Sequence, residues 1–538
     1  MTELASSGAD QTDQSDRTGI AASPGYAAGP LHPLDFVVLD YRPKGSVEAE
    51  EMALRQAIAR ASERIADIIE GAPEDSADIL EFQLAMLGDD SLSETAFTAI
   101  ADGVPADAAW SARLDEEIEG YERSPDEYFR ARAADLRDIR DQVLRALSEA
   151  ESGQSPDGAI LYGDDIAPTR FLESNWTRGG GVALAKGSAA SHVAMLARAR
   201  GVPMVVGLGH LAVAGGEPAL LDGDAGRLTV SPSPAEIADF ERRAAASASR
   251  LTAAQLHLHR AALTADGTGI AVAINVADPA DIEAVVIATC DGVGLMRTEF
   301  LFGKGLPDEE AQYLAYRAVL RWASGKPVTI RTVDAGGDKP VRGFTVQETN
   351  PFLGLRGIRL ALRRQDVFRV QVRALLRAAV DGDLRVMFPM VALASEFDDA
   401  RRLFAEEARA LADQGIGHRL PPLGIMVEVP AVAIAPETVA DAAFFSIGSN
   451  DLTQYVMAAA RDNADVAALS DVRHPAILKL IASVTAFGAA RGLPVSLCGD
   501  AGGDPDAIPH LLAAGLRSLS VAPAQLAIAK AAIAAIRI

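Results

Sequence analysis

The chain has 538 residues, of which 49% are hydrophobic and 23% charged, and its formal net charge is −24. This length favours two to four domains with a sizeable core. The acidic balance argues against sequence-independent binding to nucleic acid or to an anionic membrane, because both need basic surface.

The cysteine content and the apolar runs indicate the compartment. Two cysteines in so long a chain, Cys290 and Cys498, do not make a disulfide framework and favour a reducing compartment. The N-terminus lacks the basic and apolar pattern of a signal peptide. The sequence contains no run of about 20 uncharged apolar residues, so no transmembrane helix is predicted. We therefore expect a cytoplasmic protein without membrane insertion.

The first quarter of the chain changes character twice. Residues 1–18 are rich in Ser, Thr, Asp and Gln, which predicts a disordered tail. Residues 19–40 predict a loop followed by a strand at 36–39. From 45 to 145, four stretches place apolar residues at helical spacing and predict a small helical bundle with strongly acidic polar faces.

An α/β domain is expected to surround this bundle. Residues 19–44 and 146–232 would form it, with short strands separated by Gly and Pro from short helices, at 159–162, 182–184 and 204–206. The helical stretch 233–263 would then be a linker helix to the second half of the chain.

The second half, 264–538, alternates predicted strands with helical stretches. Eight such units fit a (β/α)8 TIM barrel. The predicted strands are 270–276, 292–296, 328–333, 384–389, 423–427, 444–448, 495–498 and 516–521. The predicted fold class is multidomain α/β: an α/β domain with an inserted helical bundle, a linker helix, and a C-terminal TIM barrel.

Charged and polar residues follow several of the predicted barrel strands, where the chemistry of a TIM barrel lies. They are Arg297, Arg331, Glu428, Asn450, Asp451, Arg461 and Cys498. Charged groups in apolar strands are costly unless they are paired or bind a ligand. The alternative to a binding site is a buried network of salt bridges.

The types of these residues favour one kind of ligand. Arginines such as Arg331 recognise phosphate and carboxylate with several donors. Glu428 and Asp451 suit Mg²⁺, which keeps waters and shares ligands with a substrate phosphate. Cys498 could donate a proton to carbon, or it could be a small core residue. Together they predict a site for a small phosphorylated carboxylate.

A candidate phosphoryl acceptor lies in the first half. Ser191 is a predicted N-cap and Gly201 a predicted stop, which places His192 in the first turn of a helix. The helix dipole there favours a neutral imidazole and a bound phosphate. A lone histidine at such a place is more often structural, so this assignment depends on the barrel.

These features together resemble Enzyme I of the bacterial phosphoenolpyruvate–sugar phosphotransferase system, from about Gly19 to the C-terminus. The segments that carry the resemblance are GVGLMRTEFLF at 292–302, RTVD with GGDK at 331–339, NPFLGLR at 350–356, GIMVEVP at 424–430 and FFSIGSNDLTQY at 444–455.

The resemblance implies a role for each site residue. His192 would be the phosphohistidine, modified on Nε2, in a swivelling α/β domain. Cys498 would protonate the enolate to pyruvate, and Glu428 and Asp451 would hold Mg²⁺. The residues implied in binding phosphoenolpyruvate are Arg297, Arg331, Asn450, Asp451 and Arg461.

The resemblance also implies partners. The helical insert 45–145 would dock the phosphocarrier protein HPr, and the barrel would form a homodimer. Three positions depart from the family pattern, Ala167 and Ala190 near the histidine and Asp500 after Cys498.

Two alternatives stay open. One is an enzyme like pyruvate phosphate dikinase or phosphoenolpyruvate synthase without its ATP domain. The other is a non-catalytic scaffold.

Overall fold

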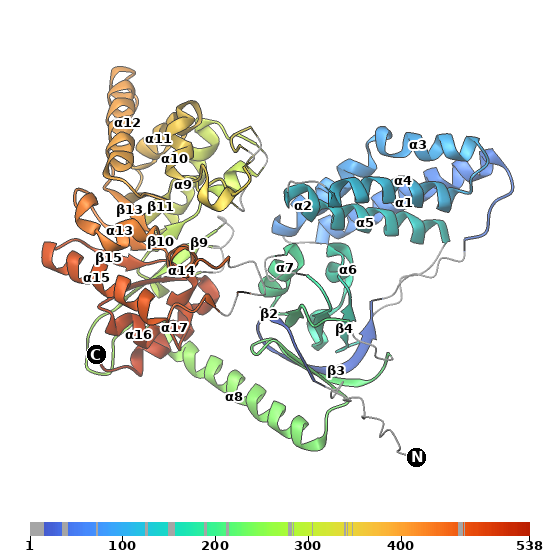
Figure 1. The fold of residues 1–538 in the computed structure, drawn as a ribbon, viewed down its shortest axis with the longest axis horizontal. Coiled ribbons are helices and arrows are strands. Elements are labelled where there is room, and N and C mark those ends of the chain that lie inside the picture. Colours follow the sequence, from blue (N-terminus) through green and yellow to red (C-terminus); the bar gives the residue numbers. More distant parts are fainter. Residues whose placement is uncertain are drawn as a thin grey trace, which may run out of the picture. The chain divides into compact units, whose positions relative to one another are not determined.

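The computed structural model describes residues 16–34, 41–71, 74–123, 127–148, 156–187, 191–210, 215–277, 282, 285–303, 305–337, 341, 343–346, 348–460, 466 and 469–538. The chain divides into two compact units, 1–246 and 247–538 (Figure 1). Helix α8, Pro234–Leu258, continues from the first unit into the second, within the predicted linker helix 233–263.

The first unit contains one eight-stranded sheet in the order β1-β8-β7-β3-β4-β5-β6-β2. β3 to β6 are parallel, and β1, β2, β7 and β8 pair antiparallel to their neighbours. The strands are β1 Asp16–Thr18, β2 Ile20–Ser23, β3 Tyr26–Pro33, β4 Ile160–Gly163, β5 Gly181–Leu184, β6 Met204–Val206, β7 Pro218–Asp222 and β8 Arg227–Val230. Helices α6, Pro168–Glu173, and α7, His192–Arg200, share a buried apolar cluster with β4, β5 and β6.

Two expectations for the N-terminal segment need correction or lie outside the described residues. β1 falls inside the segment 1–18 that was expected to be disordered. It forms because Asp16 binds Arg227 and accepts a hydrogen bond from Thr229 on the paired strand β8. β3 occupies a stretch predicted as a loop from its Gly and Pro residues. The predicted strand 36–39 lies outside the described residues.

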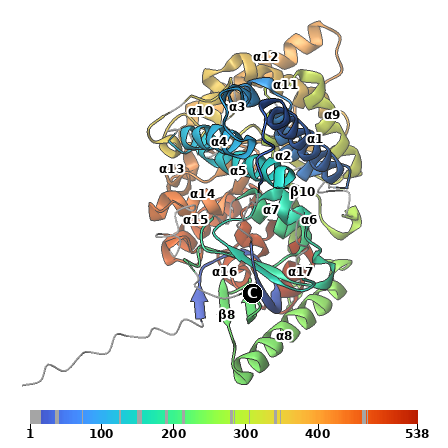
Figure 2. The ribbon, with the colours of Figure 1, turned by 90° about the vertical axis from the view of Figure 1, so that its right-hand side faces the viewer.

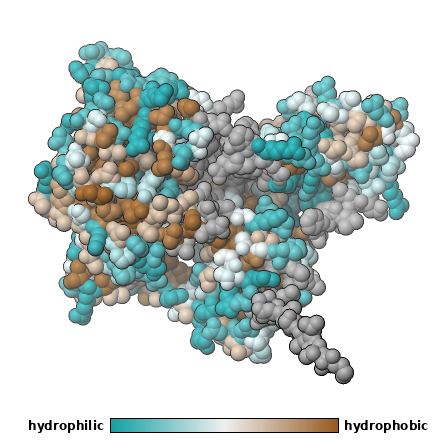
Figure 3. Space-filling model, in the orientation of Figure 1, coloured by the Kyte–Doolittle hydropathy of each residue, from teal (hydrophilic) through white to brown (hydrophobic). Residues whose placement is uncertain are grey.

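A helical bundle is inserted between β3 and β4. It has five helices where four were predicted: α1 Val47–Gly71, α2 Glu74–Leu87, α3 Asp90–Ala101, α4 Ala106–Glu122 and α5 Glu127–Ser148. The additional helix is α3, whose short Ser- and Thr-containing sequence gave no clear apolar period. The bundle has its own core, which includes Leu54, Ile100, Trp110 and Ile139. Hydrophilic side chains are spread over its face in Figure 3.

A buried polar network joins this bundle to the α/β domain. Asp138 on α5 is 2% exposed and accepts hydrogen bonds from Gln83, at 3.2 Å, and from the Thr169 hydroxyl, at 2.7 Å. Gln142 also donates to Thr169 at 2.7 Å. Burial raises the pKa of Asp138 to about 6, against the opposing effect of its hydrogen bonds.

The second unit is a closed barrel of eight parallel strands in the order β9 to β16, with β16 beside β9. The helices surround the strands (Figures 1 and 2). The strands are β9 Ala271–Val276, β10 Val293–Met296, β11 Val328–Arg331, β12 Leu384–Phe388, β13 Leu423–Val427, β14 Phe445–Ile447, β15 Val495–Leu497 and β16 Ser518–Val521. The predicted TIM barrel and its eight strands are therefore confirmed.

The barrel helices complete the alternation. They are α9 Glu309–Trp322, α10 Ile358–Arg363, α11 Gln365–Ala378, α12 Ala394–Asp413, α13 Pro430–Ile434, α14 Ser449–Met457, α15 Pro475–Arg491, α16 Ile508–Ala513 and α17 Leu526–Ala534. Among the described helices of either unit, none is both long enough and apolar enough to cross a membrane.

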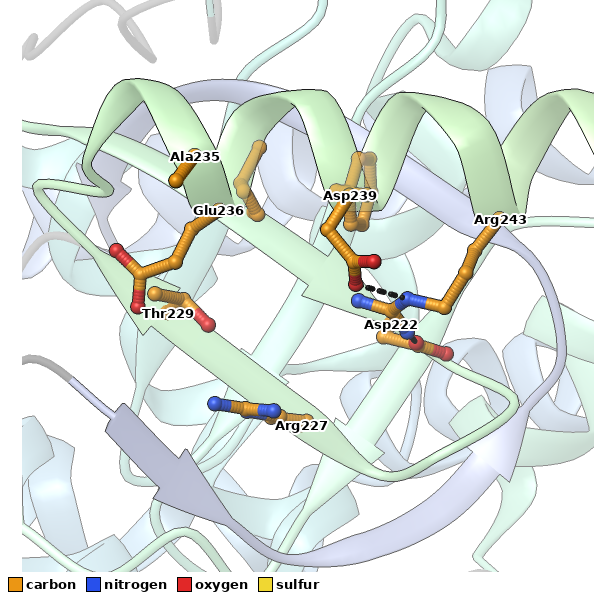
Figure 4. A pocket seen from close by; sticks show the side chains of 9 residues that line it. Asp222, Arg227, Thr229, Ala235, Glu236, Asp239 and Arg243 are labelled. Atoms are coloured by element: carbon orange, nitrogen blue, oxygen red, sulfur yellow. Dashed lines mark hydrogen bonds and ion pairs between the residues drawn. The ribbon is translucent and has the colours of Figure 1, made fainter.

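The start of α8 is anchored to the first unit beside a pocket of about 250 Å³ (Figure 4). Arg243 binds the buried carboxylate of Asp222 on β7, and its Nε lies 3.0 Å from Asp239. Phe240 packs edge-on against Tyr26, with ring centroids 5.4 Å apart. The Arg243–Asp222 ion pair and the contact between Phe240 and Tyr26 fix the helix to the sheet.

The raised pKa of Asp138 predicts a pH-dependent stability of the first unit. Between pH 4 and 6 the folded state binds more protons at this carboxyl than the unfolded state, so stability falls as pH rises. Relative to Asp138→Asn, the wild-type chain should lose about 3 kcal/mol over this range. Denaturant unfolding can be followed by fluorescence in a Trp322→Phe background, where Trp110 and Trp176 report on the first unit alone.

Asp141→Asn is the matched control, because Asp141 lies on the same helix but is 41% exposed. It should retain the wild-type pH dependence. Parallel pH curves for the wild-type chain and Asp138→Asn would contradict the assignment.

Candidate active site

The carboxyl ends of neighbouring barrel strands bring charged side chains together. Glu299 follows β10, Arg331 ends β11, and Glu428 follows β13. Asn450 and Asp451 lie in the first turn of α14, directly after β14. Because the strands are parallel, these positions share one rim of the barrel.

A buried chain of ion pairs connects several of these groups. Arg331, 4% exposed, lies 2.9 Å from Glu299 and 3.3 Å from Asp334. Arg356 is fully buried and binds Asp334 at 3.0 Å and Asp451 at 3.2 Å. The carboxylates raise the pKa of both guanidinium groups against the effect of burial, so both arginines stay charged.

Among the described carboxyls of the barrel rim, Glu428 is buried without a salt bridge to an arginine. Its Oε1 accepts a hydrogen bond from the Met390 amide at 2.6 Å, whereas Oε2 is buried and has no hydrogen-bond partner among the described residues. Burial, followed by the charges of Asp451 and Asp334, raises the pKa of Glu428 to about 8. A buried acceptor without a partner is costly, so this oxygen is a candidate ligand for a cation.

A glycine makes room beside that oxygen. A Cβ at Gly448 would lie 3.0 Å from Glu428 Oε2. No cluster of three or more His, Cys, Asp or Glu with metal-binding geometry occurs in the described part of the chain. The two predicted metal ligands, Glu428 and Asp451, are both carboxylates, and such a pair would fit a cation that keeps water or shares ligands with a substrate.

Cys498 lies inside the barrel, two residues before the exposed Asp500. It is 2% exposed and packs in an apolar cluster with Leu295, Met387, Met426 and Phe444. Burial raises the pKa of the thiol to about 11, although Ser446 and the charges of Arg331 and Arg297 lower it. The thiol therefore holds its proton at neutral pH.

The remaining predicted site residues are placed as follows. Arg297 is half-buried after β10, where its backbone N–H donates to Val276. Arg461 lies outside the described residues. His192 is the first residue of α7, and its side chain lies outside the described part of the structure. The Ser191 side chain accepts from the Ala194 amide, and Gly201 ends the helix with φ 65°, as predicted.

The structure describes hydrogen bonds at or next to two of the three positions that depart from the family pattern. Thr169, next to Ala167 and Pro168, donates its hydroxyl to Asp138. Asp500 exchanges two hydrogen bonds with Asn450. Ala190 lies outside the described residues.

Sequence reasoning did not assign Arg356 to the site. It noted the segment 350–356 only for its resemblance, because Arg356 follows no strand and precedes α10. The signal that could have identified Arg356 is a charged residue that ends the otherwise uncharged segment 350–356. Its buried place between Asp334 and Asp451 becomes visible only in three dimensions.

Comparison with known sequences identifies relatives over most of the chain. The PEP-utilising enzyme profiles match as N-terminal domain at residues 18–132, mobile domain at 155–226 and PEP-binding domain at 252–538. The phosphoenolpyruvate-protein phosphotransferase of Geobacillus stearothermophilus is 38% identical over 531 residues, covering 95% of this chain and 92% of the relative.

Relatives with the same name occur in other organisms. The protein of Haloferax volcanii is 39% identical over 475 residues, covering 86% of this chain and 82% of the relative. The protein of Bacillus subtilis is 35% identical over 521 residues, covering 94% and 91%.

The ion-pair chain predicts a large stability cost for Arg356→Met. The substitution removes the shared partner of Asp334 and Asp451, and leaving buried charge uncompensated costs about 3–5 kcal/mol. Urea unfolding followed by Trp322 fluorescence, with Trp110 and Trp176 replaced by Phe, measures the barrel. Arg359→Met is the control, because the more exposed Arg359–Glu396 pair should contribute about 1 kcal/mol or less. Equal losses in the two variants would contradict a central role for Arg356.

Proposed function

This chain belongs to the phosphoenolpyruvate-utilising enzymes and, within them, to the phosphoenolpyruvate-protein phosphotransferases, and we propose that it phosphorylates its own His192 from phosphoenolpyruvate. The phosphoryl group then passes to the histidine of HPr, and pyruvate is released, as the first step of a sugar phosphotransferase system. The observation that carries the proposal is the buried arginine–carboxylate network at the barrel rim, beside the unpartnered Glu428 oxygen.

The arginines would bind the substrate. Phosphoenolpyruvate presents a phosphate and a carboxylate, which planar guanidinium groups bind with paired hydrogen bonds. Arg331 has a buried Nε without a hydrogen-bond partner among the described residues, so it retains donor capacity. Arg297, Asn450, Asp451 and Arg461 would complete the binding site.

Glu428 and Asp451 would hold Mg²⁺. A metal site would explain why Glu428 Oε2 is buried without a partner among the described residues. It would also explain why the rim carries this fourth carboxyl beside the three that pair with Arg331 and Arg356. When bound, Mg²⁺ supplies positive charge that stabilises the phosphoryl oxygens during transfer.

His192 and Cys498 would act on opposite ends of the substrate. The neutral imidazole of His192 forms a bond to phosphorus as the bond from phosphorus to the enolate oxygen breaks. The Cys498 thiol then gives its proton to the enolate carbon, which yields pyruvate. Its raised pKa keeps that proton in place until the enolate forms, and solvent restores the proton afterwards.

The two units would have to move relative to one another. His192 belongs to the first unit and the proposed substrate site to the second. One histidine cannot serve the barrel rim and HPr from one pose, so we propose a domain swing about the linker that contains α8.

The helical bundle is the proposed docking surface for HPr. The acidic residues at 115–119 of α4 are largely paired within the bundle, since Arg113 binds Glu117 and Arg140 binds Asp115. Specific docking would therefore depend on shape as well as charge. The cytoplasmic location and a homodimer formed through the barrel belong to the same proposal.

The acceptor assignment predicts the outcome of phosphoryl labelling. The full chain, incubated with Mg²⁺ and phosphorus-labelled phosphoenolpyruvate, should acquire acid-labile label, and His192→Ala should acquire none. His210→Ala, which removes an exposed histidine of the same unit, should be labelled normally. Added HPr should discharge the labelled wild-type chain.

Other labelling patterns would contradict the proposal. Label that persists in His192→Ala would overturn the acceptor. Label from ATP in place of phosphoenolpyruvate would favour the dikinase-like alternative, and no label under any condition would favour a scaffold.

A further inference from the structure

We propose that Asp500 is a positioning residue that fixes the side-chain amide of Asn450 in the orientation that binds the anionic substrate. Asn450 Nδ2 donates to Asp500 Oδ2 at 2.8 Å, and the Asp500 backbone N–H donates to Asn450 Oδ1 at 3.2 Å. This inference rests on the proposed function, in which Asn450 binds phosphoenolpyruvate.

The two hydrogen bonds select one orientation of the amide. The Asp500 carboxylate can only accept and its backbone N–H can only donate, so a flipped Asn450 amide would satisfy neither. Phosphate and carboxylate oxygens of a substrate also accept. The clamp uses one of the two Nδ2 hydrogens of Asn450, leaves the other for the ligand, and occupies the oxygen that would repel it.

Hydrogen bonds to β14 and β9 fix the backbone of Cys498, two residues before Asp500. The Cys498 N–H donates to Ile447 O at 3.0 Å, and Asn275 Nδ2 donates to Cys498 O at 3.3 Å. Between Cys498 and Asp500 lies Gly499, where a Cβ would approach Ser449 Oγ to 1.9 Å. Only glycine permits this contact with the start of α14, so the clamp has a fixed geometry.

Asp500 has an acceptor oxygen and a negative charge, and these two properties should affect substrate binding in opposite directions. Asp500 is exposed and places a negative charge beside a site proposed for an anion, which by itself disfavours the ligand. Its contribution is therefore the acceptor oxygen. Asp500→Asn keeps an acceptor oxygen and removes the charge, whereas Asp500→Ala removes both.

The test compares Asp500→Ala and Asp500→Asn in the full chain. Loss of one exposed hydrogen bond to the amide should raise the KM for phosphoenolpyruvate about 3- to 10-fold in Asp500→Ala, with kcat of pyruvate release little changed. Asp500→Asn keeps the acceptor oxygen and removes the opposing charge, so its KM should stay at or below the wild-type value. Asp506→Ala, which removes another exposed carboxylate six residues later, is the control and should behave as wild type.

A second readout needs no substrate. The side-chain amide of Asn450 can be identified in TROSY spectra of the full chain by its loss in Asn450→Asp. We expect two resolved, slowly exchanging amide protons in the wild-type chain and in Asp500→Asn. In Asp500→Ala they should shift and exchange faster.

Two results would overturn the inference. One is an Asp500→Ala chain with unchanged KM and unchanged Asn450 resonances. The other is an Asp500→Asn chain whose KM rises as much as that of Asp500→Ala, because the negative charge of Asp500, and not its acceptor oxygen, would then be what matters. A wild-type chain that releases no pyruvate would refute the proposed function, while the amide resonances would still decide whether the clamp exists.

Discussion

Burial of opposite charges at one rim of the barrel is the constraint on which the rest of this structure depends. Arg331 and Arg356 are almost fully buried and form ion pairs with Glu299, Asp334 and Asp451. Such groups are stable only when each charge has a partner, and Glu428 adds a carboxyl with one oxygen unpartnered in the described chain. The proposal that the rim binds a cation and an anionic substrate rests on this imbalance.

The two units provide different parts of the proposed reaction. The barrel supplies a rigid, partly dry rim where fixed charges can act without reorganising water. The α/β unit supplies a histidine at the start of α7, and its bundle is joined to the sheet through Asp138 and Thr169.

The sequence predicted the barrel because each of its strands is a short apolar run between helical stretches, and all eight are present. It predicted where Arg331, Glu428, Asn450 and Asp451 would lie, because they follow strands. It did not assign Arg356, whose contacts with Asp334 and Asp451 join segments 22 and 95 residues away. It did not predict α3 or β3, because Ser and Thr in α3 and Gly and Pro in β3 interrupt the regular spacing of apolar residues by which helices and strands are recognised.

The most direct test of the proposed metal and substrate site is equilibrium binding of Mn²⁺ to the full His192→Ala chain with phosphoenolpyruvate present, measured by electron paramagnetic resonance. The account predicts one bound Mn²⁺ per chain. Glu428→Gln should lose it, and Glu437→Gln, which alters an exposed glutamate beyond α13, should keep it. Undiminished Mn²⁺ binding in Glu428→Gln would contradict the account.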